Sequence, residues 1–182
     1  FIGTDMNFKR TSARRDFSLE PPGETILDVL SLSGFEVKAI GKIEDIFMGR
    51  GITESNHAAG NVACQATILD FLKQEFEGLI FANLVDFDML YGHRNDPEGY
   101  AKALMSLDSW IPDFLNSLKT DDIAVFTADH GCDPTTVSTD HSREYVPLLV
   151  YGKNIKGGIN LGIRNSFSDI AASVSEKEFR IE

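Results

Sequence analysis

The stretch GLIFANLVDFD, residues 78–88, decides the fold because it joins an apolar run to two carboxylates. Between Leu79 and Val85 only Asn83 is polar. A continuous apolar run of this kind is typical of a strand buried on both faces of a parallel sheet. Asp86 and Asp88 follow it directly. The stretch therefore predicts a buried strand with acidic side chains at its carboxyl end.

Three further segments have the same apolar character. FEVKAI (35–40), DIAVFTA (122–128) and VPLLVY (146–151) are predicted as buried strands. Segments with apolar residues at helical spacing alternate with them, around 26–34, 59–76, 97–118 and 166–177. Alternating helices and apolar strands indicate an α/β domain with a largely parallel sheet.

Composition limits the classes of function. The 182 residues are 42% hydrophobic, enough for one substantial core, and the net charge of -11 disfavours nucleic acid as a partner. Two cysteines give no disulfide framework, and no apolar run is long enough to cross a membrane. The sequence contains no basic-then-apolar leader pattern, so secretion is not expected. We therefore expect a cytoplasmic protein without a membrane partner. Because the chain begins at Phe1, we also expect it to be part of a longer one.

Charged and ligating residues follow three of the predicted strands. In open α/β sheets, ligands bind outside the carboxyl ends of the strands. Lys42 follows the strand predicted at 35–40. The Asp140–His141 pair lies at the far end of the loop after the strand predicted at 122–128, and this loop could fold back over the same edge of the sheet. The candidate metal ligands of this edge are Asp88, His93, Asp129, His130 and His141.

This set mixes oxygen and nitrogen ligands without thiolate, which suits Mn²⁺, Zn²⁺, Fe or Mg²⁺. Five ligands exceed the three or four of one zinc site, whereas two cations about 3.5–4 Å apart would use them all and serve phosphoryl transfer. The plain alternative is that TADHG (127–131) is a polar turn and that His93 lies on a surface loop. Cys132 fits no thiolate-ligand spacing and is interpreted as inert.

Three sequence segments resemble a known family. NFKRTSARRDF (7–17), NLVDFDMLYGHRNDPEGYAKAL (83–104) and FTADHGCDPTTVSTDHSREYVPLLVYG (126–152) resemble the bacterial phosphopentomutases of the alkaline phosphatase superfamily. The likeness runs through essentially the whole chain. TADHG alone indicates only the superfamily, whereas the longer phrases are specific to the mutases. One departure is Cys132, where members of the family commonly have Asn.

The resemblance implies a fold and a division of the chain. The expected fold is an alkaline-phosphatase-like three-layer α/β sandwich that lacks its N-terminal part and most of a cap domain. Residues 1–20 would be the end of the cap and its return linker, and residues 21–182 the C-terminal part of the metal-binding core. A nucleophilic threonine and one further aspartate ligand would lie upstream, so no catalytic nucleophile is expected in this segment, which alone should be inactive.

The resemblance also implies a function and site roles. Asp129 and His130 would bind one Mn²⁺, and Asp88, His93 and His141 the other. Arg10, Arg14 and Lys42 would contact the substrate phosphate, although a solvated basic patch explains the arginines equally well.

The implied enzyme is an isomerase of nucleoside salvage. It interconverts ribose 1-phosphate and ribose 5-phosphate, or the deoxy sugars, through a phosphothreonine, with a hexose or pentose bisphosphate as activator. The alternatives are another superfamily enzyme, such as cofactor-independent phosphoglycerate mutase, and a non-catalytic metal-binding fragment.

Overall fold

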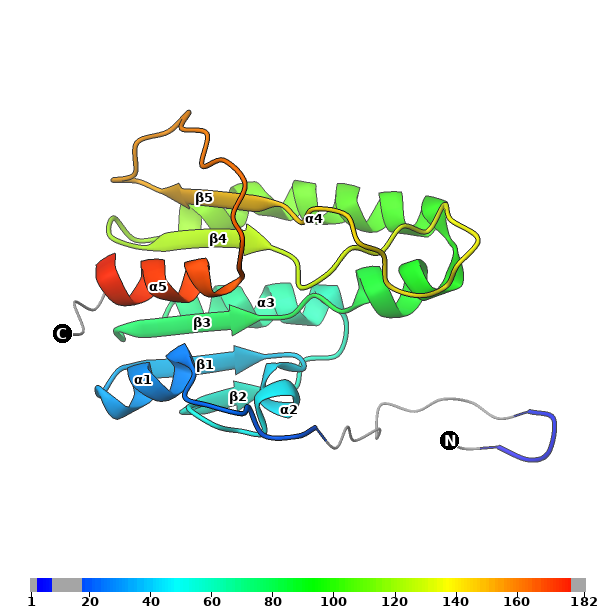
Figure 1. The fold of residues 1–182 in the computed structure, drawn as a ribbon, viewed down its shortest axis with the longest axis horizontal. Coiled ribbons are helices and arrows are strands. Elements are labelled where there is room, and N and C mark those ends of the chain that lie inside the picture. Colours follow the sequence, from blue (N-terminus) through cyan, green and yellow to red (C-terminus); the bar gives the residue numbers. More distant parts are fainter. Residues whose placement is uncertain (1–2, 8–17, 178–182) are drawn as a thin grey trace.

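Helices and strands alternate along the chain and form a layered α/β structure in the computed structural model, which describes residues 3–7 and 18–177 (Figure 1). Strands β1 (Glu36–Ile40), β2 (Glu54–Asn56) and β3 (Gly78–Ala82) form a parallel sheet in the order β2-β1-β3. Strands β4 (Ile123–Thr127) and β5 (Leu148–Gly152) form a separate antiparallel pair. The predicted α/β class with a parallel sheet is confirmed.

In the described part of the chain, five α-helices pack around the strands: α1 (Ile26–Leu32), α2 (Ile43–Phe47), α3 (Asn61–Leu72), α4 (Pro97–Ser117) and α5 (Ser168–Lys177). Figure 1 shows α1 and α5 on one side of the strands and α3 and α4 on the other. Between β3 and α4 lie a π-helix (Phe87–Tyr91) and a 3₁₀-helix (Gly92–Arg94). Helix α4 starts at Pro97, as the sequence predicted. The backbone N–H of the first helical residue has no partner within the helix, so proline loses nothing by lacking it.

Strand β1 lies at the centre of the core because it separates two buried clusters. Val37 packs with Leu27 and Leu30 of α1, and all three are fully buried. Ile40, three residues along the strand and therefore on its other face, packs with Cys64 and other residues of α3. Trp110 and Phe114 of α4 join this second cluster. Helices therefore cover both faces of β1.

The burial predicted for the other strands was wrong. Strand β3 contains no fully buried residue, and Phe81 is 36% exposed. In β4 only Ala124 is buried, and in β5 only Gly152. The apolar composition was identified correctly, but no described segment covers these strands completely. β3 and β4 are not hydrogen-bonded to one another, so each has one edge without a partner strand among the described residues.

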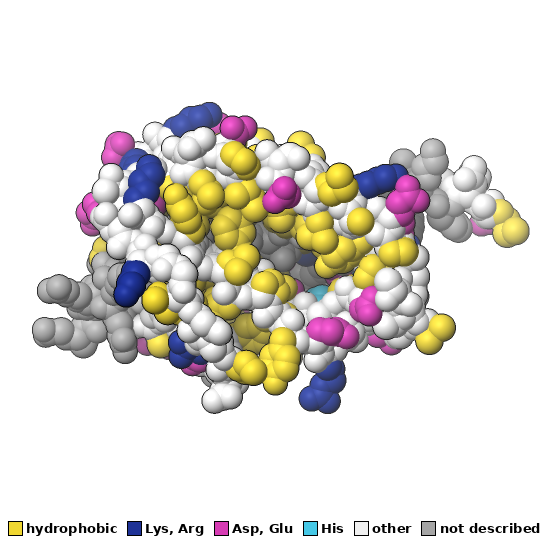
Figure 2. Space-filling view, turned by 90° about the horizontal axis from the view of Figure 1, so that it is seen from above, with side chains coloured by type: hydrophobic (Ala, Val, Ile, Leu, Met, Phe, Trp, Pro, Cys, Tyr) yellow, Lys and Arg dark blue, Asp and Glu magenta, His cyan; other side chains and the backbone are white. Residues whose placement is uncertain are grey.

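Large hydrophobic side chains gather on the surface near β4 and β5, and Figure 2 shows them around a hollow. Among the exposed large hydrophobic residues of β4, β5 and the segment after β5 are Val125, Leu149, Val150, Tyr151, Ile159, Ile163 and Phe167, which are 39% to 72% exposed. Apolar side chains that gather on a surface, as Figure 2 shows, are typical of an interaction site. Among the described residues, none of the helices is long and apolar enough to traverse a bilayer.

A buried lysine sits inside the core strand. The Lys38 ammonium, 4% exposed, pairs with Glu36 at 2.6 Å and with Glu54. It also lies 5.2 Å from the ring centre of Phe71 and 4.8 Å from that of Phe76. Burial alone would lower the pKa of Lys38, but the hydrogen bonds to the two glutamates outweigh it and raise that pKa. The two carboxylates therefore allow a charge to remain in the core.

Helix α1 begins with a capping box. The Thr25 side chain accepts a hydrogen bond from the Asp28 amide, and the Asp28 carboxylate accepts one from the Thr25 amide at 2.8 Å. Arg50 also donates to Asp28, at 3.0 Å. The backbone hydrogen bond from Thr25, helped by its hydroxyl and by Arg50, holds the pKa of Asp28 below its usual value despite burial.

Asp28→Asn is expected to lower the free energy of unfolding by about 1 kcal/mol near pH 7, because it removes the charge that these donors stabilise. The pKa of Asp28 is lower in the folded state, so its contribution is present above the unfolded value of about 4 and is lost as the pH falls through the folded value. Urea unfolding at pH 7 and near pH 2.5 should show the difference between the two proteins shrinking in acid. A difference independent of pH would contradict this account.

Candidate metal centre

The segment after β3 carries two of the predicted ligands. Asp86 is hydrogen-bonded to Asn61 at the start of α3. Its carboxylate accepts a hydrogen bond from the Asn61 backbone amide at 2.7 Å, and its own backbone amide donates one to the Asn61 side chain at 3.0 Å. This reciprocal pair fixes the chain where it leaves the sheet. Asp88 then lies on the π-helix and His93 on the 3₁₀-helix. Irregular helical turns of this kind occur often at functional sites.

The segment after β4 carries the other three. Asp129 and His130 follow the strand after one intervening residue, Ala128. The loop then returns, because the Ser142 amide donates to the Gly131 carbonyl at 2.9 Å and the two residues form an isolated bridge. This bridge places His141 beside His130, eleven positions earlier in the chain. The sequence prediction that the loop folds back over the strand end agrees with this geometry.

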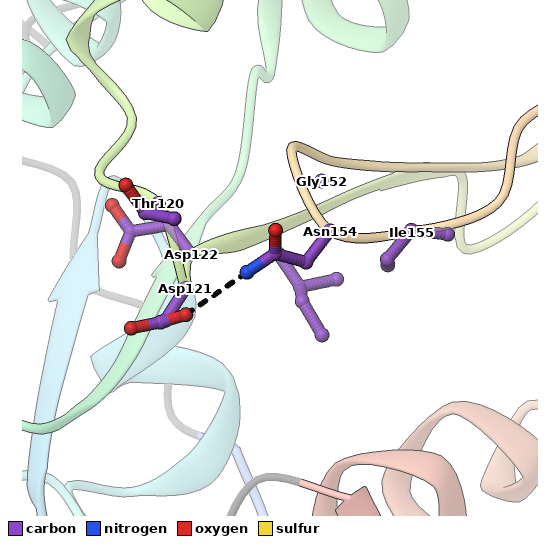
Figure 3. Close-up of a pocket in the computed structure, with 7 residues that line it drawn as sticks. Thr120, Asp121, Asp122, Gly152, Asn154 and Ile155 are labelled. Carbon is purple, nitrogen blue, oxygen red and sulfur yellow. Dashed lines mark hydrogen bonds between the residues drawn. The ribbon is translucent and has the colours of Figure 1, made fainter.

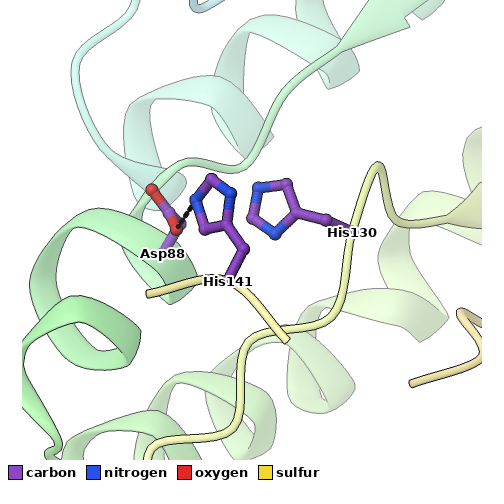
Figure 4. A group of neighbouring side chains, drawn as sticks. All are labelled: Asp88, His130 and His141. Atoms are coloured by element: carbon purple, nitrogen blue, oxygen red, sulfur yellow. Dashed lines mark ion pairs between the residues drawn. The ribbon is translucent and has the colours of Figure 1, made fainter. Parts of the chain in front are cut away.

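Asp88, His130 and His141 form a compact group, shown in Figure 4. One ligand atom from each lies within 4.8 Å of the other two. The imidazole rings of His130 and His141 stack with centroids 3.5 Å apart, and the His93 ring lies 4.9 Å from that of His141. The Asp88 Oδ1 atom is 3.1 Å from His93 Nε2 and 3.3 Å from His141 Nε2.

The donor set fits a divalent cation. Asp88 Oδ1 is buried and accepts no hydrogen bond, although a buried carboxylate oxygen normally has a partner. Carboxylate oxygen and imidazole nitrogen together are the ligands that Mn²⁺ and Zn²⁺ take. A cation among Asp88, His130 and His141 would give the unpaired oxygen its partner.

The five predicted ligands are not equally placed. Four side chains converge, those of Asp88, His93, His130 and His141. Asp129 adjoins them only through His130, with 3.6 Å between the carboxylate Oδ1 and His130 Nε2, and its side chain is 71% exposed. The assignment of these residues to two separate cations stays a prediction.

The predicted phosphate ligands are less defined. Lys42 follows β1 and precedes α2, at the carboxyl end of the parallel sheet. Arg10 and Arg14 lie outside the described residues.

Sequence reasoning missed contacts that join the two ligand-bearing segments. The Cys132 thiol, interpreted as inert, lies against Gly92 of the other segment, since a Cβ atom added to that glycine would lie under 3.0 Å from the Cys132 sulfur. Burial and the neighbouring Asp88 raise the pKa of this thiol. The His93 ring contacts the Thr139 carbonyl, and the Asn95 amide donates to the Thr136 and Ser138 carbonyls. Backbone carbonyls as partners leave no signal in a residue pattern.

A separate hollow lies at the other end of β4, lined by Thr120–Ile123, Gly152, Asn154 and Ile155 (Figure 3). The Asn154 side chain donates to Asp121 across its rim at 3.1 Å. Because it adjoins the start of β4 and the end of β5, it is distinct from the cluster that follows the end of β4. It contains no histidine or thiol, and it is not the candidate metal centre.

Comparison with known proteins gives consistent matches. The Metalloenzyme superfamily model matches residues 34–179. A phosphopentomutase of Acetivibrio thermocellus is 59% identical over 175 residues, 96% of this chain and 45% of that protein. Phosphopentomutases of Clostridium kluyveri and Alkaliphilus oremlandii are 56% and 54% identical over 176 residues, 97% of this chain and 45% of each relative. The chain thus spans somewhat less than half the length of the curated relatives it matches.

Proposed function

This chain belongs to the Metalloenzyme superfamily, and from that membership we propose that it is the C-terminal part of a phosphopentomutase. The enzyme would interconvert ribose 1-phosphate and ribose 5-phosphate, or their deoxy forms, as an isomerase of nucleoside salvage in the cytoplasm. The convergence of Asp88, His130 and His141 in one cluster carries the proposal. Identity of 52–59% to proteins named phosphopentomutase supports the choice of this activity within the superfamily.

The chain's own residues would hold two divalent cations, Mn²⁺ in the first place. Asp88, His93 and His141 would bind one, and Asp129 with His130 the other. Bound cations would neutralise charge on a transferring phosphoryl group. The two imidazole nitrogens close to Asp88 Oδ1 support the first cation site more strongly than the exposed Asp129 side chain supports the second. Lys42, Arg10 and Arg14 would bind the substrate phosphate by charge-assisted hydrogen bonds.

The division of the chain follows from the same proposal. Residues 1–20 would close a cap domain and residues 21–182 would complete the metal-binding core. The exposed hydrophobic residues near β4 and β5, and the edges of β3 and β4 that have no partner strand among the described residues, support a larger core in the intact protein. A threonine nucleophile and one more aspartate ligand would lie in the remaining part. The threonine would accept a phosphoryl group and pass it to the sugar, giving a bisphosphate, and a sugar bisphosphate would act as activator.

The test is turnover of ribose 5-phosphate by the intact protein with Mn²⁺. We expect conversion to ribose 1-phosphate, loss of activity after chelation, and recovery when Mn²⁺ is restored. The chain 1–182 alone should be inactive, since the proposed nucleophile is outside it. Turnover of 3-phosphoglycerate instead would favour a phosphoglycerate mutase, and metal binding without turnover by the intact protein would favour a non-catalytic role.

A further inference from the structure

The loop after β4, which carries His141, has little packing of its own. Residues 135–141 are all exposed, and Val137 in the middle of this stretch is fully exposed. A stretch of this kind gains little from apolar burial, and such segments open easily. Its position beside Asp88 therefore depends on hydrogen bonds to another segment of the chain.

Those hydrogen bonds come from the 3₁₀-helix and the residue after it, 41 to 46 positions earlier in the sequence. Asn95 donates through its side-chain Nδ2 to the Thr136 carbonyl and, at 3.3 Å, to the Ser138 carbonyl. The His93 ring contacts the Thr139 carbonyl through Nδ1. Among the described residues, these are the hydrogen bonds that join this stretch to a segment outside its own loop.

Asn95 is suited to this contact by its backbone and by its side chain. Its backbone is left-handed, with φ 49° and ψ 45°, a conformation that asparagine adopts more readily than most residues. Its side-chain amide has two N–H donors, one for each carbonyl. The Oδ1 atom is buried and has no hydrogen-bond partner among the described residues. An amide that leaves one buried atom unpaired while it binds carbonyls of exposed residues contributes little to stability, which favours a positioning role.

These contacts lie next to two histidines of the cluster. Asn95 is two positions after His93, and the carbonyls that it binds are three and five positions before His141. The two imidazole rings are 4.9 Å apart, and their Nε2 atoms are 3.1 and 3.3 Å from Asp88 Oδ1. Because the Thr139 carbonyl only accepts, the neutral His93 ring carries its hydrogen on Nδ1, and Nε2 is the nitrogen available to a cation. A shift of the loop on the 3₁₀-helix would disturb all of these contacts.

We propose that Asn95 is a positioning residue of the metal centre, whose side-chain amide holds the loop after β4 on the 3₁₀-helix and so keeps His93 and His141 together at Asp88. The inference rests on the proposed metal site. Asn95 binds the loop and not the cation, so it acts only through the histidines. Its loss should therefore weaken cation binding while the metal-free protein stays folded.

The experiment measures Mn²⁺ affinity of the intact protein and of its Asn95→Gly variant, from the electron paramagnetic resonance signal of free Mn²⁺. Glycine keeps the left-handed backbone without strain and removes both donors, whereas alanine would add a backbone penalty. Asn95→Gly should weaken Mn²⁺ binding by roughly 10-fold or more, as does the loss of other groups that orient metal ligands. The melting temperature of the metal-free protein should fall by no more than about 3 °C, since exposed carbonyls can bind water instead.

Asn154→Gly is the matched control. It makes the same substitution at the other end of β4, where the Asn154 side chain donates to Asp121 at 3.1 Å beside the separate hollow. Its Mn²⁺ affinity should equal that of the unmodified protein. Its melting temperature shows what the loss of one exposed asparagine side chain does to stability when no proposed ligand is involved.

The outcomes separate the two proposals when His130→Ala is included. Equal Mn²⁺ affinity in Asn95→Gly and in the unmodified protein, with weaker binding in His130→Ala, overturns the role of Asn95 and leaves the metal site standing. Unfolding of metal-free Asn95→Gly also overturns that role, because Asn95 would then support the fold, and so does an equal loss of affinity in Asn154→Gly. If the unmodified protein and His130→Ala bind Mn²⁺ equally, the metal site and the role of Asn95 are both wrong.

Discussion

Asp88→Asn should lower both the Mn²⁺ affinity and the mutase turnover of the intact protein by a factor on the order of 10³, because about 4 kcal/mol of charge stabilisation would be lost. The substitution keeps the shape of the side chain and removes only its charge. Asp88 Oδ1 is the oxygen nearest to both His93 and His141, so its loss affects every ligand of that part of the cluster. The measurements are Mn²⁺ titration and turnover of ribose 5-phosphate with and without excess Mn²⁺.

Asp140→Asn provides the matched control. The same chemical change is made next to His141, on an exposed residue whose amide donates to the Ser138 hydroxyl at 3.1 Å. Activity should stay within about twofold, since surface substitutions of this kind change free energies by only about 0.5 kcal/mol. If Asp88→Asn keeps more than a tenth of the original turnover, or if Asp140→Asn loses as much as Asp88→Asn, Asp88 is not a ligand of the reacting centre.

The convergence of the ligands could be predicted because it follows from general rules of sheets. An apolar run followed by Asp88 and a second followed by His130 indicate two strand ends, and parallel strands of an α/β sheet end at one edge. The doubled Asp-His pair suggested that the loop folds back to place His141, and the Gly131–Ser142 bridge closes that loop. Patterns of residue types were sufficient for these features.

Other features depend on three-dimensional neighbours that no pattern encodes. The π-helix that carries Asp88 and the seat of Cys132 beside Gly92 arise from packing between distant segments. The burial of Lys38 depends on two glutamates from different strands. Lysine is normally an exposed residue, so its residue type alone predicts the opposite. For β3, β4 and β5, apolar composition predicts that a strand needs cover but not which segment supplies it, so the expected burial was wrong for these strands.

Gly51→Ala should lower the free energy of unfolding by about 3–5 kcal/mol, the sum of a left-handed backbone penalty and of overpacking. Gly51 has φ +68°, and an added Cβ would lie under 3.0 Å from backbone atoms of Leu27 and Asp28 in α1. These atoms belong to the backbone of a helical turn in which Leu27 is fully buried, so they cannot move aside cheaply. The adjacent Arg50, which donates to the Pro21 carbonyl at 2.9 Å and to Asp28, would be displaced with the loop.

Gly34→Ala separates the two causes. Gly34 also has a positive φ, +88°, but an added Cβ would find nothing within 4 Å. Gly34→Ala should therefore lower the free energy of unfolding by the backbone penalty alone, about 1–2 kcal/mol. Urea unfolding of the two variants and the unmodified protein measures both values. Equal losses would show that close approach to α1 contributes nothing. The free energy of unfolding could instead fall for Gly51→Ala and stay unchanged for Gly34→Ala. That result would mean that contact with α1, and not backbone conformation, requires a glycine at position 51.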